Sequence, residues 1–271
     1  MPSRPSPPDP ARSRNPADYQ HLPQPVAAMA KEFMPSANTG PHTHPRGQLL
    51  YAVAGVMRVG TPGGFWTLPP LRALWVPPGV EHAVEMLEAV SMRTLYVHAD
   101  AARTLWPHCQ VLEVSPLLRE LILALAAEPM QYDPTPHTRA GLVAALLLEE
   151  LRGAPVLPIQ IPWPQDRRLQ TICRALLAQP GLQRRIEDWG DAVGASGRTL
   201  IRLFQAELGL NYRQWVQQVR LAEALRRLSQ GQPVARVAAE LGYRSPSAFS
   251  AMFRKALGAP PQHYLKASAP G

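Results

Sequence analysis

Between about residue 26 and residue 100, short apolar runs alternate with clusters of glycine and proline. The runs cover residues 48–53, 56–59, 73–76 and 92–97, and turn clusters at 61–64 and 77–79 separate them. Short strands at even spacing with turn residues between them are typical of an all-β sandwich or barrel. The pattern therefore predicts a β-domain over residues 26–112.

After residue 115 the apolar periodicity becomes helical. It predicts a first helix over residues 116–127, capped by Ser115, and a second over residues 138–152. The second helix is rich in Leu and Ala and presents Leu142 and Leu146. Two interpretations stay open for it: packing within its own domain, or contact with a second copy in a homodimer.

Two proline-rich segments flank these parts. Residues 1–25 contain eight prolines and predict a disordered tail. Residues 153–164 contain four prolines without a clear period, which indicates a stiffened linker. The remaining predicted segments are a helical pair over residues 113–152 and an all-helical domain over residues 165–266.

Charge is distributed unevenly along the chain. Residues 1–164 hold 12 Lys+Arg and 13 Asp+Glu, a net charge of −1, whereas residues 165–271 hold 16 and 7, a net charge of +9. A basic domain of this kind is suited to binding a polyanion such as DNA. A solvated basic surface that only increases solubility would give the same net charge.

The sequence disfavours two classes of protein, those that span a membrane and those that are secreted. No apolar run approaches the roughly 18–20 residues that cross a bilayer, and no stretch resembles a secretory signal. Cys109 and Cys173 form no metal-ligand or CxxC spacing, so we interpret them as reduced thiols. We therefore expect a cytoplasmic protein without membrane contact.

An internal near-repeat is the strongest signal in the chain. It consists of residues 186–204 and residues 234–253, with a small residue four positions before a turn glycine in each copy (Gly190 and Gly194; Ala238 and Gly242). A small residue lets two helices cross closely, and glycine tolerates the positive φ of a turn. The repeat predicts two helix-turn-helix units.

Each copy then begins a second helix with a serine. Ser196 and Ser245 can cap the first turn, and Pro246 suits a first helical position. Between the copies, residues 212–228 carry apolar side chains at three- and four-residue spacing, which predicts one amphipathic connecting helix. If both second helices enter successive major grooves, they lie about 34 Å apart on one face of the duplex.

Residues 165–266 resemble the DNA-binding domain of the AraC/XylS family of bacterial regulators. The matching positions are Arg220, Leu221, Ala224, Leu225, Leu228, Val237, Ala238, Leu241, Gly242, Tyr243, Ser245, Phe249, Phe253, Gly258 and Pro261. The resemblance implies transcription control, with double-stranded promoter DNA as partner and RNA polymerase as a candidate partner.

By position, the resemblance assigns DNA contacts to both second helices. The predicted residues are Ser196, Arg198, Thr199, Ile201 and Arg202 in the first unit, and Arg244, Ser245, Pro246, Ser247, Ser250 and Arg254 in the second. An arginine at 198 or 202 can pair with guanine, while a phosphate contact or an intradomain ion pair is the alternative for Arg202. Ala251 stands where relatives often have a long polar side chain, which predicts weak base contact by the second unit.

The β-domain carries two histidine motifs. His42 and His44 are followed by Gln48, and His82 ends the segment Pro77–Pro78–Gly79–Val80–Glu81–His82. These spacings resemble the two motifs of the cupin barrel, which implies a cupin-like effector domain. In metal-binding cupins the histidines converge with an acidic residue, and Gln48 stands at that acidic position.

Three interpretations of the histidines stay open. They hold a divalent transition metal, they line a pocket for a small organic effector, or they are structural. An enzymatic cupin with a DNA-binding appendage is the alternative function, but Gln48 supplies no carboxylate. A non-specific DNA-coating protein would not need two spaced units. The sequence therefore predicts an α+β multidomain regulator, not an enzyme, whose barrel responds to an effector or a metal.

Overall fold

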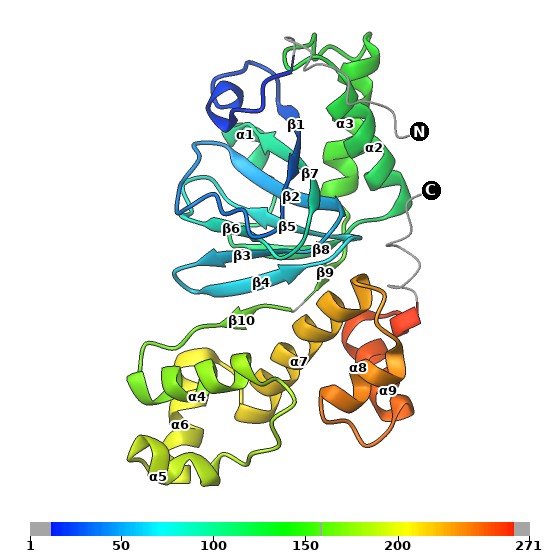
Figure 1. Cartoon of the computed structure of the whole chain (residues 1–271). Helices are drawn as coiled ribbons and strands as arrows, with labels where there is room; N and C mark the ends of the chain where they lie inside the picture. The colour runs from blue at the N-terminus through cyan, green and yellow to red at the C-terminus, as the bar shows by residue number, and fades with distance from the viewer. Residues whose placement is uncertain (1–11, 158, 263–271) are drawn as a thin grey trace.

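The computed structural model describes residues 12–157 and 159–262 and consists of a β-rich domain and a helical domain (Figure 1). Two sheets form the β-rich domain. The larger has strand order β1-β7-β2-β5-β8-β9 and the smaller β10-β4-β3-β6. The strands are β1 Val26–Phe33, β2 Gly47–Ala54, β3 Met57–Thr61, β4 Gly64–Leu68, β5 Arg72–Val76, β6 Ala83–Met86, β7 Val90–Val97, β8 Gln110–Glu113, β9 Val156–Leu157 and β10 Ile161–Pro162.

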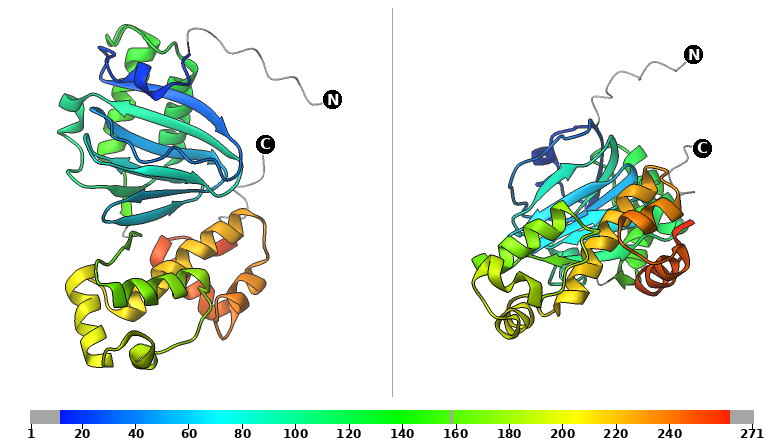
Figure 2. Two further views of the ribbon diagram at one scale, coloured as in Figure 1. Left: turned by 60° about the vertical axis from the view of Figure 1, so that its left-hand side comes forward. Right: turned by 60° about the horizontal axis from the view of Figure 1, so that its bottom comes forward.

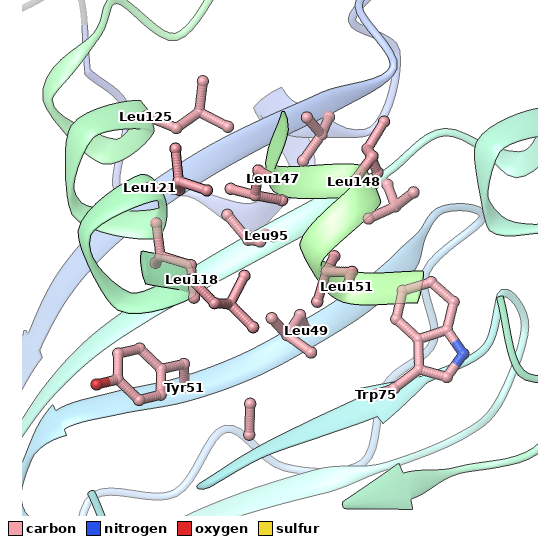
Figure 3. Packing of buried hydrophobic residues seen from close by; sticks show 14 of the residues in the cluster. Leu49, Tyr51, Trp75, Leu95, Leu118, Leu121, Leu125, Leu147, Leu148 and Leu151 are labelled. Atoms are coloured by element: carbon pink, nitrogen blue, oxygen red, sulfur yellow. The ribbon is translucent and has the colours of Figure 1, made fainter. Parts of the chain in front are cut away.

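Strand β2 is buried on both faces, which explains its nearly continuous apolar run. Because side chains alternate along a strand, Leu50 and Ala52 point to the core between the two sheets. Leu49 and Tyr51 point the other way, toward the core beneath the helices α2 (Pro116–Ala127) and α3 (Arg139–Arg152). Figure 3 shows the leucines of both helices packed over these strand residues. The β-rich domain is thus the predicted cupin-like barrel with a helical cover on one sheet.

Helix α3 divides its leucines between two environments. Its inner face, including Leu147 and Leu151, is buried against the sheet and α2. Leu142 and Leu146 instead remain 56% and 45% exposed. Packing within the domain therefore does not account for these two side chains.

The predicted disordered tail needs correction over residues 12–25. Residues Pro16–Tyr19 form a short 3-10 helix, and Tyr19 is buried against Tyr96 with ring centroids 5.5 Å apart. The buried guanidinium of Arg46 donates hydrogen bonds to the carbonyl oxygens of Gln20 and Gln24. These long-range contacts anchor a segment whose composition alone predicts disorder, while residues 1–11 lie outside the described part of the chain.

The predicted linker over residues 153–164 also needs correction. Its residues Val156–Leu157 form strand β9, which pairs with β8, and Ile161–Pro162 form strand β10, which pairs with β4. Each strand is only two residues long, so neither produces a detectable period. The segment therefore completes both sheets as it leads into the helical domain.

The helical domain contains two cores joined by one long helix. Its elements are α4 Arg167–Ala178, the 3-10 turn η2 Glu187–Trp189, α5 Gly190–Val193, α6 Gly197–Leu208, α7 Tyr212–Ser229, α8 Val234–Glu240 and α9 Pro246–Leu257. The first half of α7 packs in the core with α4 and α6, and its second half packs with α8 and α9. Figure 2 shows α7 passing between the two groups of helices. Helix α1 (Ala99–Ala102) lies in the β-rich domain.

The smaller sheet of the β-rich domain and the turn after its strand β6 contact the helical domain. The indole Nε1 of Trp215 in α7 donates to the carbonyl oxygen of Pro162 at 2.9 Å. At the other end of α7, the hydroxyl of Ser229 donates to the Glu88 carboxylate at 3.1 Å. Burial raises the pKa of this Glu88 carboxyl group. Among the described residues, no helix has the length and apolar character needed to span a membrane.

Candidate DNA-binding surface and effector site

The local signals of both helix-turn-helix units are confirmed. The Ser196 hydroxyl accepts from the Thr199 amide at 3.3 Å, and the Ser245 hydroxyl accepts from the Ala248 amide at 3.1 Å. The turn residues Gly194 and Gly242 have φ angles of +65° and +77°. Each second helix, α6 or α9, therefore begins at the position that its capping serine predicts.

Helix α6 separates a buried face from an exposed face. Leu200 and Phe204 are fully buried in the first core. Arg198, Ile201 and Arg202 are exposed, and Ile201 is an apolar side chain with half of its surface accessible. An exposed row of two arginines and an isoleucine, in a domain of strong positive charge, can contact phosphates, base edges and thymine methyl groups.

Helix α9 has the same arrangement with shorter side chains. Phe249 and Phe253 are fully buried. The predicted contact residues Arg244, Pro246, Ser247 and Arg254 are exposed, and Ser250 is half-buried. All predicted contact residues of this unit lie on α9 or in the turn before it. Among them, the arginines stand at the two ends of the described segment, Arg244 before the helix and Arg254 in its last turn.

The three motif histidines meet although they are distant in sequence. The backbones of His42 and His82 form an antiparallel bridge with two N–H···O bonds of 3.0 Å. One nitrogen atom from each of His42, His44 and His82 can be chosen so that all three lie within 4.8 Å of one another. His42 is half-buried and the other two are buried.

Hydrogen bonds orient two of the imidazoles. Because a carbonyl oxygen can only accept, Nδ1–H of His42 donates to Gly40 at 2.8 Å and Nδ1–H of His82 donates to Val80 at 3.0 Å. In a neutral ring this leaves the Nε2 lone pair available as a ligand. The Nε2 atoms of His44 and His82 are buried without a hydrogen-bond partner in the described residues.

Burial keeps the His44 and His82 rings neutral. Burial, together with the neighbouring imidazoles of His42 and His82, lowers the pKa of His44 to about 4. Burial likewise lowers the pKa of His82. The neutral His44 and His82 rings, each with an unpartnered Nε2, and the nearby His42 provide nitrogen ligands of the kind that a divalent transition metal requires.

Gln48 and Tyr96 complete the surroundings of the histidines. The Gln48 amide is buried, its Oε1 has no partner within the described chain, and its Nε2 donates to the Tyr96 hydroxyl at 3.5 Å. The Tyr96 ring lies edge-on against His44, with centroids 5.3 Å apart. Tyr96 is not among the residues predicted from the sequence. Its alternation on strand β7 places it inside the barrel, but only the pairing of β7 with β2 brings it beside Gln48.

Comparisons with known proteins agree with this two-domain organisation. The family model for an AraC-like ligand binding domain matches residues 34–152, and a model for a helix-turn-helix domain matches residues 189–267. The HTH-type transcriptional regulator NimR of Escherichia coli K12 is 34% identical over 224 residues, which cover 83% of this chain and 81% of that protein. An uncharacterized HTH-type transcriptional regulator of Haemophilus influenzae is 34% identical over 103 residues, or 38% of this chain and 35% of that one.

Solved structures resemble the chain more distantly. A ToxT structure from Vibrio cholerae aligns with 90% of this chain and 99% of its own, at 8% identity and a TM-score of 0.38. Together, the sensor barrel and the paired helix-turn-helix units define a DNA-binding transcription regulator with a ligand-binding domain. The chain belongs to the AraC family.

Proposed function

We propose that this regulator senses a divalent transition metal ion bound by His42, His44 and His82. The observation that carries the proposal is the convergence of the three histidines, with ligand nitrogens within 4.8 Å of one another and a buried, unpartnered Nε2 on both His44 and His82. When bound, the ion would supply positive charge and Lewis acidity to this pocket. Gln48 lies on the same inner face and offers an amide oxygen.

Binding rather than catalysis is the role that the donor set supports. Among the described residues, the histidine cluster contains no carboxylate, and the neighbouring Glu81 is exposed. Catalytic metal sites of this kind depend on a positioned acid or base to move protons. We therefore propose a sensor without turnover, acting in the cytoplasm where promoter DNA and RNA polymerase are present.

The signal would travel through the strand that follows His82. Strand β6 begins at Ala83, and the turn after it carries Glu88, which accepts a hydrogen bond from Ser229 at the end of α7. Helix α7 belongs to both helix-turn-helix cores. We propose that metal binding shifts the population between two placements of α7, and so the spacing of α6 and α9 on DNA.

The DNA-binding part of the proposal predicts a specific role for Arg202. Purified protein is used to capture random genomic fragments at near-physiological salt, and enrichment of a few sites defines the operator. On that operator, Arg202→Ala is expected to cost about 1–3 kcal/mol and to relax the preference at one base pair, because the exposed guanidinium contacts a base edge. Binding of operator variants by fluorescence anisotropy measures both effects.

The result distinguishes base contact from phosphate contact. An equal loss of affinity for all duplexes, with a shallower salt dependence, would show instead that Arg202 contacts the phosphate backbone of the DNA. Arg103→Ala is the matched control, because Arg103 lies on the β-rich domain with 81% of its side chain exposed. Even capture of all fragments, with no enriched site, would contradict sequence-specific regulation.

We also propose that the exposed leucines of α3 form a homodimer contact. Leu142 and Leu146 lie one turn apart on the same face of α3, and neither has a buried environment in the single chain. The double variant Leu142→Glu/Leu146→Glu is expected to be folded and monomeric at micromolar concentration, because both side chains are exposed in the single chain. Sedimentation velocity measures the oligomeric state, and a dimer that survives both charges would exclude this face.

A further inference from the structure

A basic cleft lies between the two helix-turn-helix units, and none of the predicted DNA contacts except Ile201 lines it. Its volume is about 760 Å³. The walls come from α6, the start of α7, α9 and the loop over residues 183–187. Ile201 of α6 and Met252 of α9 both contribute to the lining, so the cleft connects the two recognition helices.

The charge of the cleft is strongly positive. Its lining includes Arg184, Arg185, Arg213 and Arg220, against Glu187 as the acidic lining residue. Arg185 pairs with Glu187 at 3.3 Å, which leaves three guanidinium groups without an acidic counterpart in the lining. Such a concentration of positive charge on one concave surface favours an anionic partner.

Two of these arginines are fixed by their own contacts. The Arg184 guanidinium lies over the Trp189 ring at 4.1 Å from its centroid. Arg220 donates to the carbonyl oxygens of Pro180 and Leu182. Neither guanidinium pairs with an acidic side chain within residues 12–157 and 159–262. These contacts therefore fix both groups at the cleft and leave their positive charge uncompensated.

Arg213 differs because it is exposed and no acidic group of the described ranges pairs with it. It lies on α7 four positions before Gln217 and seven before Arg220, so the three side chains share one face of the helix. A long cation and an amide in the lining of a basic cleft match the donors that proteins use for phosphate oxygens.

The geometry of DNA identifies what faces this cleft. When α6 and α9 occupy successive major grooves, the minor groove between them and the two strands that border it face the protein. We propose that the cleft binds the phosphodiester backbone beside this central minor groove, with Arg213 as the principal contact. The inference rests on both recognition helices engaging one duplex, as the proposed function requires, and adds a sequence-independent site between them.

The salt dependence of binding tests the cleft on any duplex, whether or not its sequence is the operator. Each phosphate contact contributes about 0.9 to the slope of log affinity against log salt. Arg213→Ala is expected to bind a random-sequence duplex and the captured operator about tenfold more weakly, with a slope shallower by about 0.9 on both. Arg103→Ala, which removes the same charge from the β-rich domain, is expected to leave slope and affinity unchanged.

A second measurement locates the contact on the DNA. Methylphosphonates placed between the two half-sites of the operator remove the backbone charge there. They are expected to weaken DNA binding by the wild-type protein but not by Arg213→Ala. Methylphosphonates outside the site are expected to change the affinity of both proteins equally. Folding of the variant is checked by thermal unfolding, which should not change because Arg213 is exposed.

The outcomes separate this inference from the proposed function. An unchanged slope for Arg213→Ala would overturn the cleft contact even if the operator is bound specifically. A changed preference at one base pair, with no effect on the random duplex, would also overturn it. A shallower slope on every duplex supports the cleft, and it does so even if genomic capture finds no preferred site and specific regulation fails.

Discussion

Zinc uptake is expected to fall from one equivalent per chain to none when His82 is replaced with alanine. Three imidazoles converge in the barrel, and stable binding of a transition metal needs about three protein side chains that are strong ligands. Removing His82 leaves only two imidazole ligands, and the amide oxygen of Gln48 is a weaker ligand for such a metal than the lost imidazole. Metal content after gel filtration, measured by atomic emission, checks the prediction, and Co²⁺ absorption bands report the ligand set.

The controls address folding and non-specific uptake. His108→Ala removes an exposed histidine elsewhere in the β-rich domain and is expected to retain one equivalent. Replacement of the buried His82 can also affect folding, so His42→Ala, at a half-buried position, is the second test variant. In the absence of metal, thermal unfolding of His42→Ala should match that of the wild type. If the wild-type protein takes up no transition metal, the sensor proposal is wrong and an organic effector becomes the interpretation to pursue.

Gly242→Ala is expected to destabilise the helical domain by about 2–4 kcal/mol. The φ angle of +77° is costly for a residue with a side chain, and a Cβ here would lie 2.1 Å from Nε2 of Gln183 and 2.9 Å from the carbonyl oxygen of Gly181. The Gln183 Nε2 also donates to the Gly242 carbonyl at 2.8 Å. The substitution therefore strains the turn of the second helix-turn-helix unit. It also pushes this turn away from Gly181 and Gln183, in the loop that precedes the first unit.

Gly194 provides the matched control at the same position of the first unit. Its φ angle of +65° is similar, but a Cβ there has no neighbour within 4 Å among the described residues. Gly194→Ala is expected to lose only about 1 kcal/mol, the cost of the left-handed conformation. Urea unfolding measured by tryptophan fluorescence compares the two, and equal losses would show that the contact between the units carries no strain.

The sequence alone predicted features that depend on a few neighbouring residues. The capping serines, the positive-φ glycines and the buried pair in each recognition helix are local signals, and the repeat made them specific. Helix α2 begins at Pro116 and ends at Ala127, as its period predicts. The resemblance to known motifs then supplied the family and its function, which the comparisons confirm.

What the sequence missed depends on contacts between distant segments. Residues 12–25 are polar and rich in proline, and long-range contacts such as those with the buried Arg46 and Tyr96 explain their order. The histidine motifs were recognised by spacing, but their convergence and their unpartnered nitrogens depend on the backbone bridge between His42 and His82.

The basic cleft had no signal in any single stretch of sequence. Its arginines come from a loop and from α7, and their alignment depends on how two helix-turn-helix units pack against one helix. The sequence by itself thus determined the modules, because helix caps, turns and apolar periods are local properties. The tertiary structure alone decided which polar groups face one another, since that depends on the burial and pairing of residues far apart in the chain.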